Sequence, residues 1–207
     1  MTSIRITAGR RRSPEIEGRA LDAAIALYAR GGWRALTFDA IARGAGVGKG
    51  AIYRRWPSRR ALLRDTLEAR WFTIGNIDEG TLREDLLALA RSYLAALIGP
   101  HGGVLTHLQA DAQFFKEARQ VTGPYGRRMI LQARHIIRRA LDRRELTAGI
   151  DSSLLIDVII GGLTNHVVST PRRLRGAMIT KSARYVVELV DVALRGVEAA
   201  NKPGSYR

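Results

Sequence analysis

The stretch GAGVGKGAIYRRWPS, residues 44–58, looks like a nucleotide-binding loop when it is taken alone. Gly46, Gly48 and Ala51 fit G-x-G-x-x-[G/A], the fingerprint of a dinucleotide-binding turn between a strand and a helix. The segment just before it, TFDAIARGA, instead begins with a threonine N-cap and has apolar residues at helical spacing. Because a short helix stands where the fingerprint requires a strand, the sequence disfavours a nucleotide site.

The second phosphate-loop pattern, G-x-x-x-x-G-K-[ST], also fails, because Arg43 and Gly50 occupy positions that require Gly and Ser or Thr. A helix, a glycine turn and a second short helix are instead the parts of a helix-turn-helix unit. Gly46 permits the sharp reversal, Val47 anchors the turn, and Ile52 buries the inner side of the second helix. We therefore predict a helix-turn-helix at this point of the chain.

The outer face of that second helix, expected over about 49–56, is basic. Its polar side chains are Lys49, Tyr53, Arg54 and Arg55. A short helix with such a face fits the major groove of DNA, which is roughly 12 Å wide. Between Arg43 and Arg60 the chain has six basic residues and no acidic one, so this segment carries a concentrated positive field.

The charge of the whole chain points to a polyanionic partner. Its 207 residues include 34 basic and 19 acidic ones, a net charge of +15. Residues 1–75 hold 15 basic and 6 acidic residues (+9), and the remaining 132 hold 19 and 13 (+6). This asymmetry favours nucleic acid. The alternative is the surface of a protein from an arginine-rich proteome, since only four of the 34 basic residues are lysine.

Composition excludes several other classes. The chain has no cysteine, which removes disulfides, thiol chemistry and cysteine-ligated zinc. Its four histidines lack H-x-x-x-H or H-E-x-x-H spacing, and no nucleophile stands in a recognisable order with a base, so we expect neither a metal site nor a cofactor. No run of 18 apolar residues and no leader-like apolar segment occur, so we expect a cytoplasmic protein without a membrane span.

The remaining pattern is helical, and no alternating strand is evident, so the predicted fold is all-α. Helices are expected from Pro14 to the glycine pair at 31–32, over Phe38 to about Gly44, and over 59–75. Thr81 and Glu84 form a T-x-x-E capping box ahead of a helix that Gly99 and Pro100 end. Four more helices are expected at 104–116, 124–145, 152–169 and 177–199, and Asp151 is the expected N-cap of the third.

At this point a family resemblance becomes specific. The stretch LTFDAIARGAGVGKGAIYRRWPSRRALLRDTL, residues 36–67, resembles the DNA-binding region of the TetR family of transcriptional repressors, with A-G-V, [IL]-Y and the following cap in register. The resemblance covers roughly residues 14–72. Gly48 replaces the usual Ser at the cap of the recognition helix, Trp56 the common Phe and Arg59 the common Lys. None of these departures breaks the mechanism, although glycine weakens the cap by a few tenths of a kcal/mol.

The resemblance implies roles on DNA for eight residues. Phosphate contacts are expected from Thr37, Tyr53 and Arg59, close backbone approach at Gly50, base contacts from Lys49, Arg54 and Arg55, and either role for Arg43. An exposed charge on a solvated face is the plain alternative for each of the charged residues. Trp56 is expected in the core. The arm with Arg5 and Arg10–Arg12 either enters the minor groove or is a mobile terminus.

Residues 76–199 resemble the helical regulatory domain of the same family. This resemblance implies a homodimer through the last two long helices. An apolar stripe in the last helix supports the dimer, although the same stripe would serve an intramolecular core equally well. Its residues are Val186, Val187, Val190, Ala193, Leu194 and Val197. Gly161 and Gly162 permit close helix approach. The family also implies a pocket for an unknown small-molecule ligand, with polar or aromatic candidates at Tyr93, His107, Gln113, Phe114, Gln132, His135, Asn165 and His166.

The predicted organisation therefore has five parts: a flexible basic arm (1–12), a helix-turn-helix DNA-binding domain (13–57), a connecting helix (58–75), a helical regulatory and dimerisation domain (76–200) and a tail (201–207). The predicted function is a sequence-specific transcriptional regulator, a repressor released from a palindromic operator of double-stranded DNA by a small molecule. A non-specific architectural DNA-binding protein and an all-α enzyme are the alternatives. Against the enzyme stands the absence of paired carboxylates in a shared context.

Overall fold

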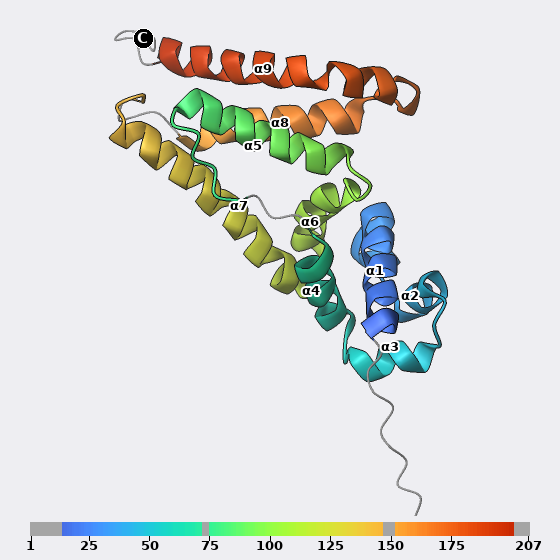
Figure 1. Ribbon diagram of the computed structural model, residues 1–207. Helices are drawn as coiled ribbons and strands as arrows, with labels where there is room; N and C mark the ends of the chain where they lie inside the picture. The colour runs from blue at the N-terminus through green and yellow to red at the C-terminus, as the bar shows by residue number, and fades with distance from the viewer. Residues whose placement is uncertain (1–13, 72–74, 147–151, 201–207) are drawn as a thin grey trace, which may run out of the picture.

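In the computed structural model, which describes residues 14–71, 75–146 and 152–200, every regular element is a helix (Figure 1). The all-α fold predicted from the sequence is thus confirmed. The elements are α1 (Pro14–Ala35), α2 (Phe38–Ala45), α3 (Lys49–Arg55), α4 (Arg59–Arg70), α5 (Leu82–Ile98), α6 (Gly103–Phe114), α7 (Lys116–Asp142), α8 (Ser152–Ser169), the short 3₁₀ turn η1 (Arg172–Leu174) and α9 (Arg175–Ala200).

The helices divide into a head, which consists of α1 to α4, and a body, which consists of α5 to α9. In Figure 1, α1, α2 and α3 form one end of the molecule. At the opposite end α9 lies along α8 and α5, and the long α7 runs diagonally between the two ends.

No single helix in the described ranges is long and apolar enough to cross a bilayer. The pair 153–169 and 172–197 reaches that length and composition only across a bend of 108°.

The chain has two hydrophobic cores, one in the head and one in the body. The head core is completed by residues of the body. The body core is built mainly from α5, α7, α8 and α9, and Leu105 of α6 also belongs to it. The head core contains α1 to α4, but also Val104 and Leu108 of α6 and Ala118 and Val121 of α7. The body therefore supplies part of the apolar surface on which the head depends, and a movement of α6 or α7 is felt in the head.

Several boundaries differ from the predicted ones. The connecting helix predicted for 58–75 ends at Arg70, because Trp71 is extended (φ −93°, ψ 143°) and packs against both cores. The helix predicted for 104–116 ends at Phe114, since Phe115 is extended and separates α6 from α7. The helix predicted for 124–145 spans Lys116–Asp142 and contains Pro124, because Ala118 and Val121 are buried in the head core and hold the turns before the proline.

Other predictions concern the last helices. Ser152–Ser169 matches the prediction for α8, while its expected N-cap, Asp151, lies outside the described residues. α9 begins at Arg175, two residues earlier than predicted. Of its apolar stripe, Val186, Val190 and Ala193 are buried in the core of the chain itself. The intramolecular alternative therefore holds for these three residues.

A break in α1 joins the head to α6. Gly31 (φ −148°, ψ 16°) and Gly32 (φ 59°, ψ −152°) leave the helical region, at the RGGW stop that the sequence predicts. The Trp33 amide thereby turns out of the helix and donates to Oδ2 of the buried Asp111 at 2.7 Å. A Cβ on Gly32 would lie 2.7 Å from that oxygen and 2.8 Å from Nδ1 of His107, so both the backbone angle and the space require glycine.

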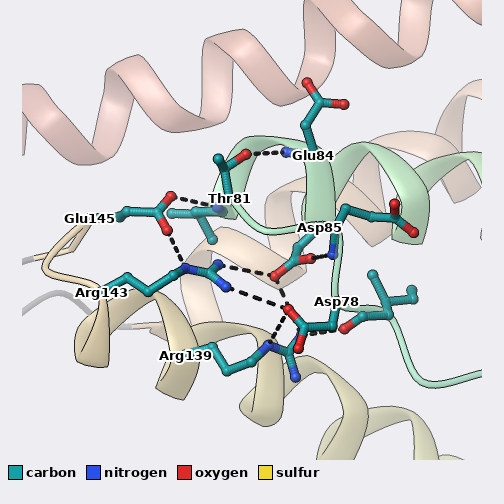
Figure 2. Close-up of polar contacts among 10 residues, drawn as sticks. Asp78, Thr81, Glu84, Asp85, Arg139, Arg143 and Glu145 are labelled. Carbon is teal, nitrogen blue, oxygen red and sulfur yellow. Dashed lines mark hydrogen bonds and ion pairs between the residues drawn. The ribbon is translucent and has the colours of Figure 1, made fainter.

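A polar clasp, defined as Asp78, Asp85, Arg139, Arg143 and Glu145, ties the start of α5 to the end of α7 (Figure 2). The Asp85 side chain has no solvent exposure; its Oδ2 lies 3.3 Å from Arg139 Nη2 and 3.2 Å from Arg143 Nη2, and its Oδ1 accepts from the Glu79 amide at 2.6 Å. Two guanidinium groups and an amide thus compensate this buried carboxylate.

The clasp also alters the predicted capping box. Thr81 Oγ1 accepts from the Glu84 amide at 3.2 Å, as the T-x-x-E pattern predicts. The Glu84 carboxylate, however, pairs with Arg83 at 3.1 Å. A carboxylate from the end of α7 reaches the first turn instead, because Glu145 Oε2 accepts from the Leu82 amide at 2.5 Å. The N-terminus of α5 is thus capped from a distant part of the chain.

We predict that Asp85→Ala costs about 3–5 kcal/mol of unfolding free energy, because it removes the buried one of the two carboxylates that Arg139 and Arg143 share and leaves the Glu79 amide without its acceptor. Urea denaturation followed by circular dichroism measures this cost. The matched control is Glu84→Ala, which removes an exposed carboxylate from the same turn and is expected to cost under about 1 kcal/mol. Equal losses from the two variants would contradict a central role for the clasp.

Candidate nucleic-acid interface and ligand cavity

Backbone geometry fixes the direction in which α3 leaves α2. Thr37 Oγ1 accepts from the Ala40 amide at 3.2 Å and caps the start of α2. At its end Gly46 adopts the left-handed region (φ 63°, ψ 39°). The Gly46 amide donates to the Arg43 carbonyl at 3.2 Å and the Val47 amide to the Ala42 carbonyl at 3.0 Å. This pair of bonds satisfies the last carbonyls of α2 and defines a sharp, specific turn.

Two sets of contacts hold α3, the expected recognition helix, in place: those of its own inner side and those at the start of α4. Ile52 has no exposed surface and packs in the head core. Trp56, expected in the core, is buried, and its Nε1 donates to Asp65 Oδ2 at 2.9 Å. Ser58 Oγ accepts from the Ala61 amide at 3.2 Å and begins α4. At Gly48 no side chain caps α3, so packing rather than capping holds this helix of seven residues.

The outer side of α3 is exposed, with Lys49, Gly50, Tyr53 and Arg54 all facing solvent. The Tyr53 side chain is 59% exposed, and its ring stands edge-on against Phe38, with centroids 4.8 Å apart at 89°. That contact holds the ring on the head and leaves the hydroxyl in solvent. A Cβ at Gly50 would lie 3.1 Å from Arg54 Nη1, so the arginine folds back over the glycine. Any side chain at position 50 would displace it.

Two of the predicted contacts have partners within the head. Lys49 Nζ pairs with Asp39 Oδ2 at 2.9 Å, and both side chains are largely exposed. Such a surface pair contributes only about 0–1 kcal/mol, so a phosphate competes with it readily. Arg59 is more firmly held: its Cζ lies 4.5 Å from the centroid of the Trp33 ring, and its Nη1 donates to the Trp33 carbonyl at 3.4 Å. Its phosphate contact remains a prediction.

The other predicted residues flank this face. Thr37 is exposed at the start of α2, and Arg43 is exposed within α2. Arg55 is half-buried at the end of α3. The structure thus brings an exposed hydroxyl, a phenol and several cations onto two short helices in a fixed arrangement. Such a surface can position phosphates and present donors to base edges.

A cavity of about 440 Å³ lies in the body between α5, α6, α7 and α8, with Trp71 at one side. Its apolar lining consists of Trp71, Leu89, Tyr93, Leu105, Leu108, Ala112, Met129, Ile130, Ala133, Ile156 and Ile160. The polar side chains in its lining are Gln109, Thr122, Tyr125, Arg128, Gln132 and Asp157. The size and the apolar character match a site for a small organic molecule.

Of the eight predicted ligand contacts, Tyr93 and Gln132 line this cavity. The other six are not in its lining. His107 lies against Tyr28 of α1, with ring centroids 6.1 Å apart, and His166 stacks on Tyr185 at 3.9 Å. The remaining four are exposed: Gln113, Phe114, His135 and Asn165. Within the part of the chain that the structure describes, no three histidine or acidic side chains gather as metal ligands.

Sequence reasoning missed the residues that connect the head with the body. The Trp33 amide and Asp111 are 78 positions apart, and Arg60 Nη1 donates to Gln120 Oε1 across 60 positions. The second contact borders an open crevice of about 850 Å³ between α4 and α7. No local pattern identifies such pairs. A lone acidic residue on an otherwise apolar face, as at Asp111, was the one available signal.

Two family models match the chain. "Bacterial regulatory proteins, tetR family" covers residues 20–66, and "Tetracyclin repressor-like, C-terminal domain" covers residues 76–186. Among curated relatives, the uncharacterized HTH-type transcriptional regulator YdeS of Bacillus subtilis is 27% identical over 93% of this chain and 95% of its own. The HTH-type transcriptional regulator AqdR of Rhodococcus erythropolis is 30% identical over 76% of both chains.

A solved structure gives the same fold. The transcriptional regulator FadR from Bacillus subtilis, crystallised in complex with stearoyl-CoA, is similar with a TM-score of 0.60. The identity is 19%, and the match covers 87% of this chain and 96% of the other. At that identity the likeness concerns the fold, which agrees with the two family models in placing a helix-turn-helix ahead of a helical domain.

We predict that Asp39→Asn strengthens binding to random duplex DNA about two- to fivefold at low salt, because it removes the carboxylate paired with Lys49. The gain should fade above roughly 0.3 M salt as screening grows. Fluorescence anisotropy with a labelled duplex measures both effects. Glu188→Gln, which neutralises an exposed carboxylate on α9, is the control expected to change little. An equal gain from both would mean that only net charge matters.

Proposed function

The chain belongs to the TetR family of transcriptional regulators, and on this premise we propose that it is a repressor which a small-molecule ligand releases from a palindromic operator. One observation carries the ligand-responsive part of the proposal. The helices that wall the cavity, α6 and α7, also supply Val104, Leu108, Ala118 and Val121 to the head core. A molecule that shifts either helix therefore acts on the support of the recognition helix.

Sequence-specific binding rests on the exposed face of α3. Ile52 fixes the helix to the head, and Lys49, Tyr53 and Arg54 project from the opposite side. In this proposal α3 enters the major groove, with Arg54 suited to guanine and Tyr53 to a phosphate. Thr37 and Arg43 on the preceding helix lie where backbone contacts would set the register. The arm at 1–12, outside the described residues, adds charge to this end of the chain.

A homodimer is supported by an apolar surface that the chain leaves uncovered. Leu154, Val158 and Val168 of α8 are 40–59% exposed, and Gly161 lies between them with open space where its side chain would be. Ile179 and Val192 are exposed on α9. A second copy packed on α8 and α9 would bury this surface. Two heads could then meet successive major grooves about 34–36 Å apart, which is the reason to expect a palindrome.

Release follows as a shift between two states. A ligand must bind more tightly to the state that does not fit DNA, and such couplings typically amount to about 1–3 kcal/mol. Tyr125 and Arg128 of α7 line both the cavity and the crevice against α4, so this part of α7 faces ligand and head at once. The fold neighbour crystallised with stearoyl-CoA supports the idea that this fold can hold a ligand with a long apolar chain.

The proposal has one alternative within DNA binding, a non-specific architectural protein that uses charge alone. The enzyme alternative is set aside, because the relatives of this chain are transcriptional regulators. A repressor acts where the chromosome lies, so we place the protein in the cytoplasm. Selection of bound duplexes from a random pool decides between the two DNA-binding modes. Enrichment of a palindrome is the expected result, and a pool that stays random would overturn the repressor proposal.

We predict that Arg54→Ala costs about 1–3 kcal/mol in binding to the selected operator and reduces discrimination against random DNA. The physical reason is the loss of base-edge donors, which leaves phosphate contacts in place. Competitive binding measurements with operator and random duplexes provide the test. Arg172→Ala, an exposed arginine of η1, is the control with equal charge change. An equal loss on both duplexes from Arg54→Ala would show that Arg54 touches only phosphate.

We also predict that Val158→Arg yields monomers, because a charge would be buried in the proposed interface. Sedimentation velocity at micromolar concentration measures the oligomeric state, and operator binding should weaken in parallel. Leu131→Arg, which places the same charge at an exposed leucine of α7, should leave both unchanged. If Val158→Arg sediments like the unmodified chain, the dimer interface lies elsewhere.

A further inference from the structure

The crevice between α4 and α7 differs in chemistry from the cavity inside the body. The two helices lie side by side where the head meets the body, and the space between them measures about 850 Å³ (Figure 1). Its charged lining consists of Arg55, Arg60, Arg64, Asp65, Glu68 and Arg128. Four arginines and two carboxylates give this lining a formal charge of +2, so the crevice attracts anions.

Both carboxylates of the crevice are already engaged on the head side. Asp65 Oδ1 accepts from Nε of Arg64 at 3.0 Å and from its Nη2 at 2.9 Å. The other oxygen of Asp65 accepts from the Trp56 indole at 2.9 Å. Glu68 follows Arg64 by one turn of α4, and its charge acts on the same guanidinium. The negative charge of the crevice is thus balanced largely by Arg64.

Arg60 and Arg128 are two cations that this arrangement leaves unbalanced. Across the described ranges neither forms an ion pair with a carboxylate. Arg60 Nη1 donates instead to the neutral amide oxygen of Gln120. One arginine belongs to the head and the other to the body, and both side chains are exposed, so a ligand from solvent reaches them directly.

The spacing of these two cations indicates the size of the anion. Gln120, which contacts Arg60, and Arg128 are eight residues apart on α7, or about 12 Å along its axis. A ligand with negative charges several Å apart therefore matches the pair better than a single phosphate ion does. The volume of the crevice also falls in the range of sites for organic molecules.

The neutral part of the lining suits an organic framework. Its apolar surface comes from Trp56, Pro57, Ala61, Val121 and Pro124. Its neutral polar side chains are Ser58, Gln120 and Tyr125. Burial raises the pKa of the Tyr125 hydroxyl, so the phenol is a neutral hydrogen-bond donor at pH 7.

We propose that the crevice binds an organic polyanion of about nucleotide size, with Arg60 of the head and Arg128 of the body as its charged contacts. A guanidinium fork donates two parallel hydrogen bonds to a phosphate or a carboxylate, so each arginine holds one charged group. This site goes beyond the proposed function, whose effector binds in the apolar cavity. Tyr125 and Arg128 border both spaces, so the two occupants would influence each other.

Four probes test the charge and the organic part separately: ATP, tripolyphosphate, citrate and adenosine. Isothermal titration calorimetry measures their binding to the full chain at pH 7, without DNA and without divalent metal. At least one of the three anions should bind with a Kd below about 1 mM, and adenosine should not bind detectably. A preference for the two phosphates or for citrate then identifies which charged group the arginines select.

Arg128→Gln should weaken the bound anion about tenfold or more, because it removes one charged pair of donors. Arg60→Gln should do the same from the head side. The matched control is Arg138→Gln, an exposed arginine of α7 outside the crevice lining and about 15 Å farther along the axis. At about 0.1 M salt that distance exceeds the screening length, so the control should change the affinity less than about twofold.

Two results in the calorimetry overturn the inference: no binding of any anion, or equal losses from Arg128→Gln and Arg138→Gln, which would mean that only net charge matters. A third concerns DNA. If Arg128→Gln weakens binding to a random duplex as much as it weakens the anion, the crevice belongs to the DNA-binding surface. The proposed function is judged separately by operator selection. A chain that selects a palindrome but binds no anion keeps the repressor role and loses this site.

Discussion

The hydrogen bond from the Trp33 amide to the buried Asp111 carboxylate joins head and body beside the apolar core that the two share. It exists because the glycine pair opens α1 and turns one amide sideways. The guanidinium of Arg59 in α4 lies over the Trp33 ring and donates to the Trp33 carbonyl. Because Asp111 belongs to α6, the helices α1, α4 and α6 all meet at Trp33. Losing Asp111 would leave a buried amide without a partner, which is costlier than losing a surface bond.

The surroundings of this contact are apolar and closely packed. Tyr28 of α1 has no exposed surface and packs edge-on against His107 of α6. Burial raises the pKa of the Tyr28 hydroxyl far above its ordinary value, and the nearby charge of Asp111 adds to the rise. The phenol therefore stays neutral at physiological pH and adds no second negative charge beside Asp111. A junction of this kind transmits displacement because it cannot absorb it by repacking.

The sequence predicted the head far better than the body. Thr37, Gly46 and Ser58 determine their caps and turns within a few residues, so the boundaries of α2 and α3 follow from local pattern. The start of α7 does not: Pro124 marked a helix start, while burial of Ala118 against the head extends the helix upstream. Ligand contacts were the least predictable. A polar residue such as His135 or Asn165 carries no local sign of facing solvent, and the lining of the cavity comes from helices that are far apart in the sequence.

The clasp at the end of α7 has a mechanical consequence for the cavity. Arg139 and Arg143 hold that end against Asp85, while Gln120 near the other end touches Arg60 of the head. Met129, in the cavity lining, lies ten residues from Arg139, and Gln120 lies nineteen, or about 15 Å and 28 Å along the axis. If α7 tilts as one rod about its clasped end, Gln120 moves about twice as far as Met129. The helix is then a lever that enlarges at the head a small displacement made at the ligand.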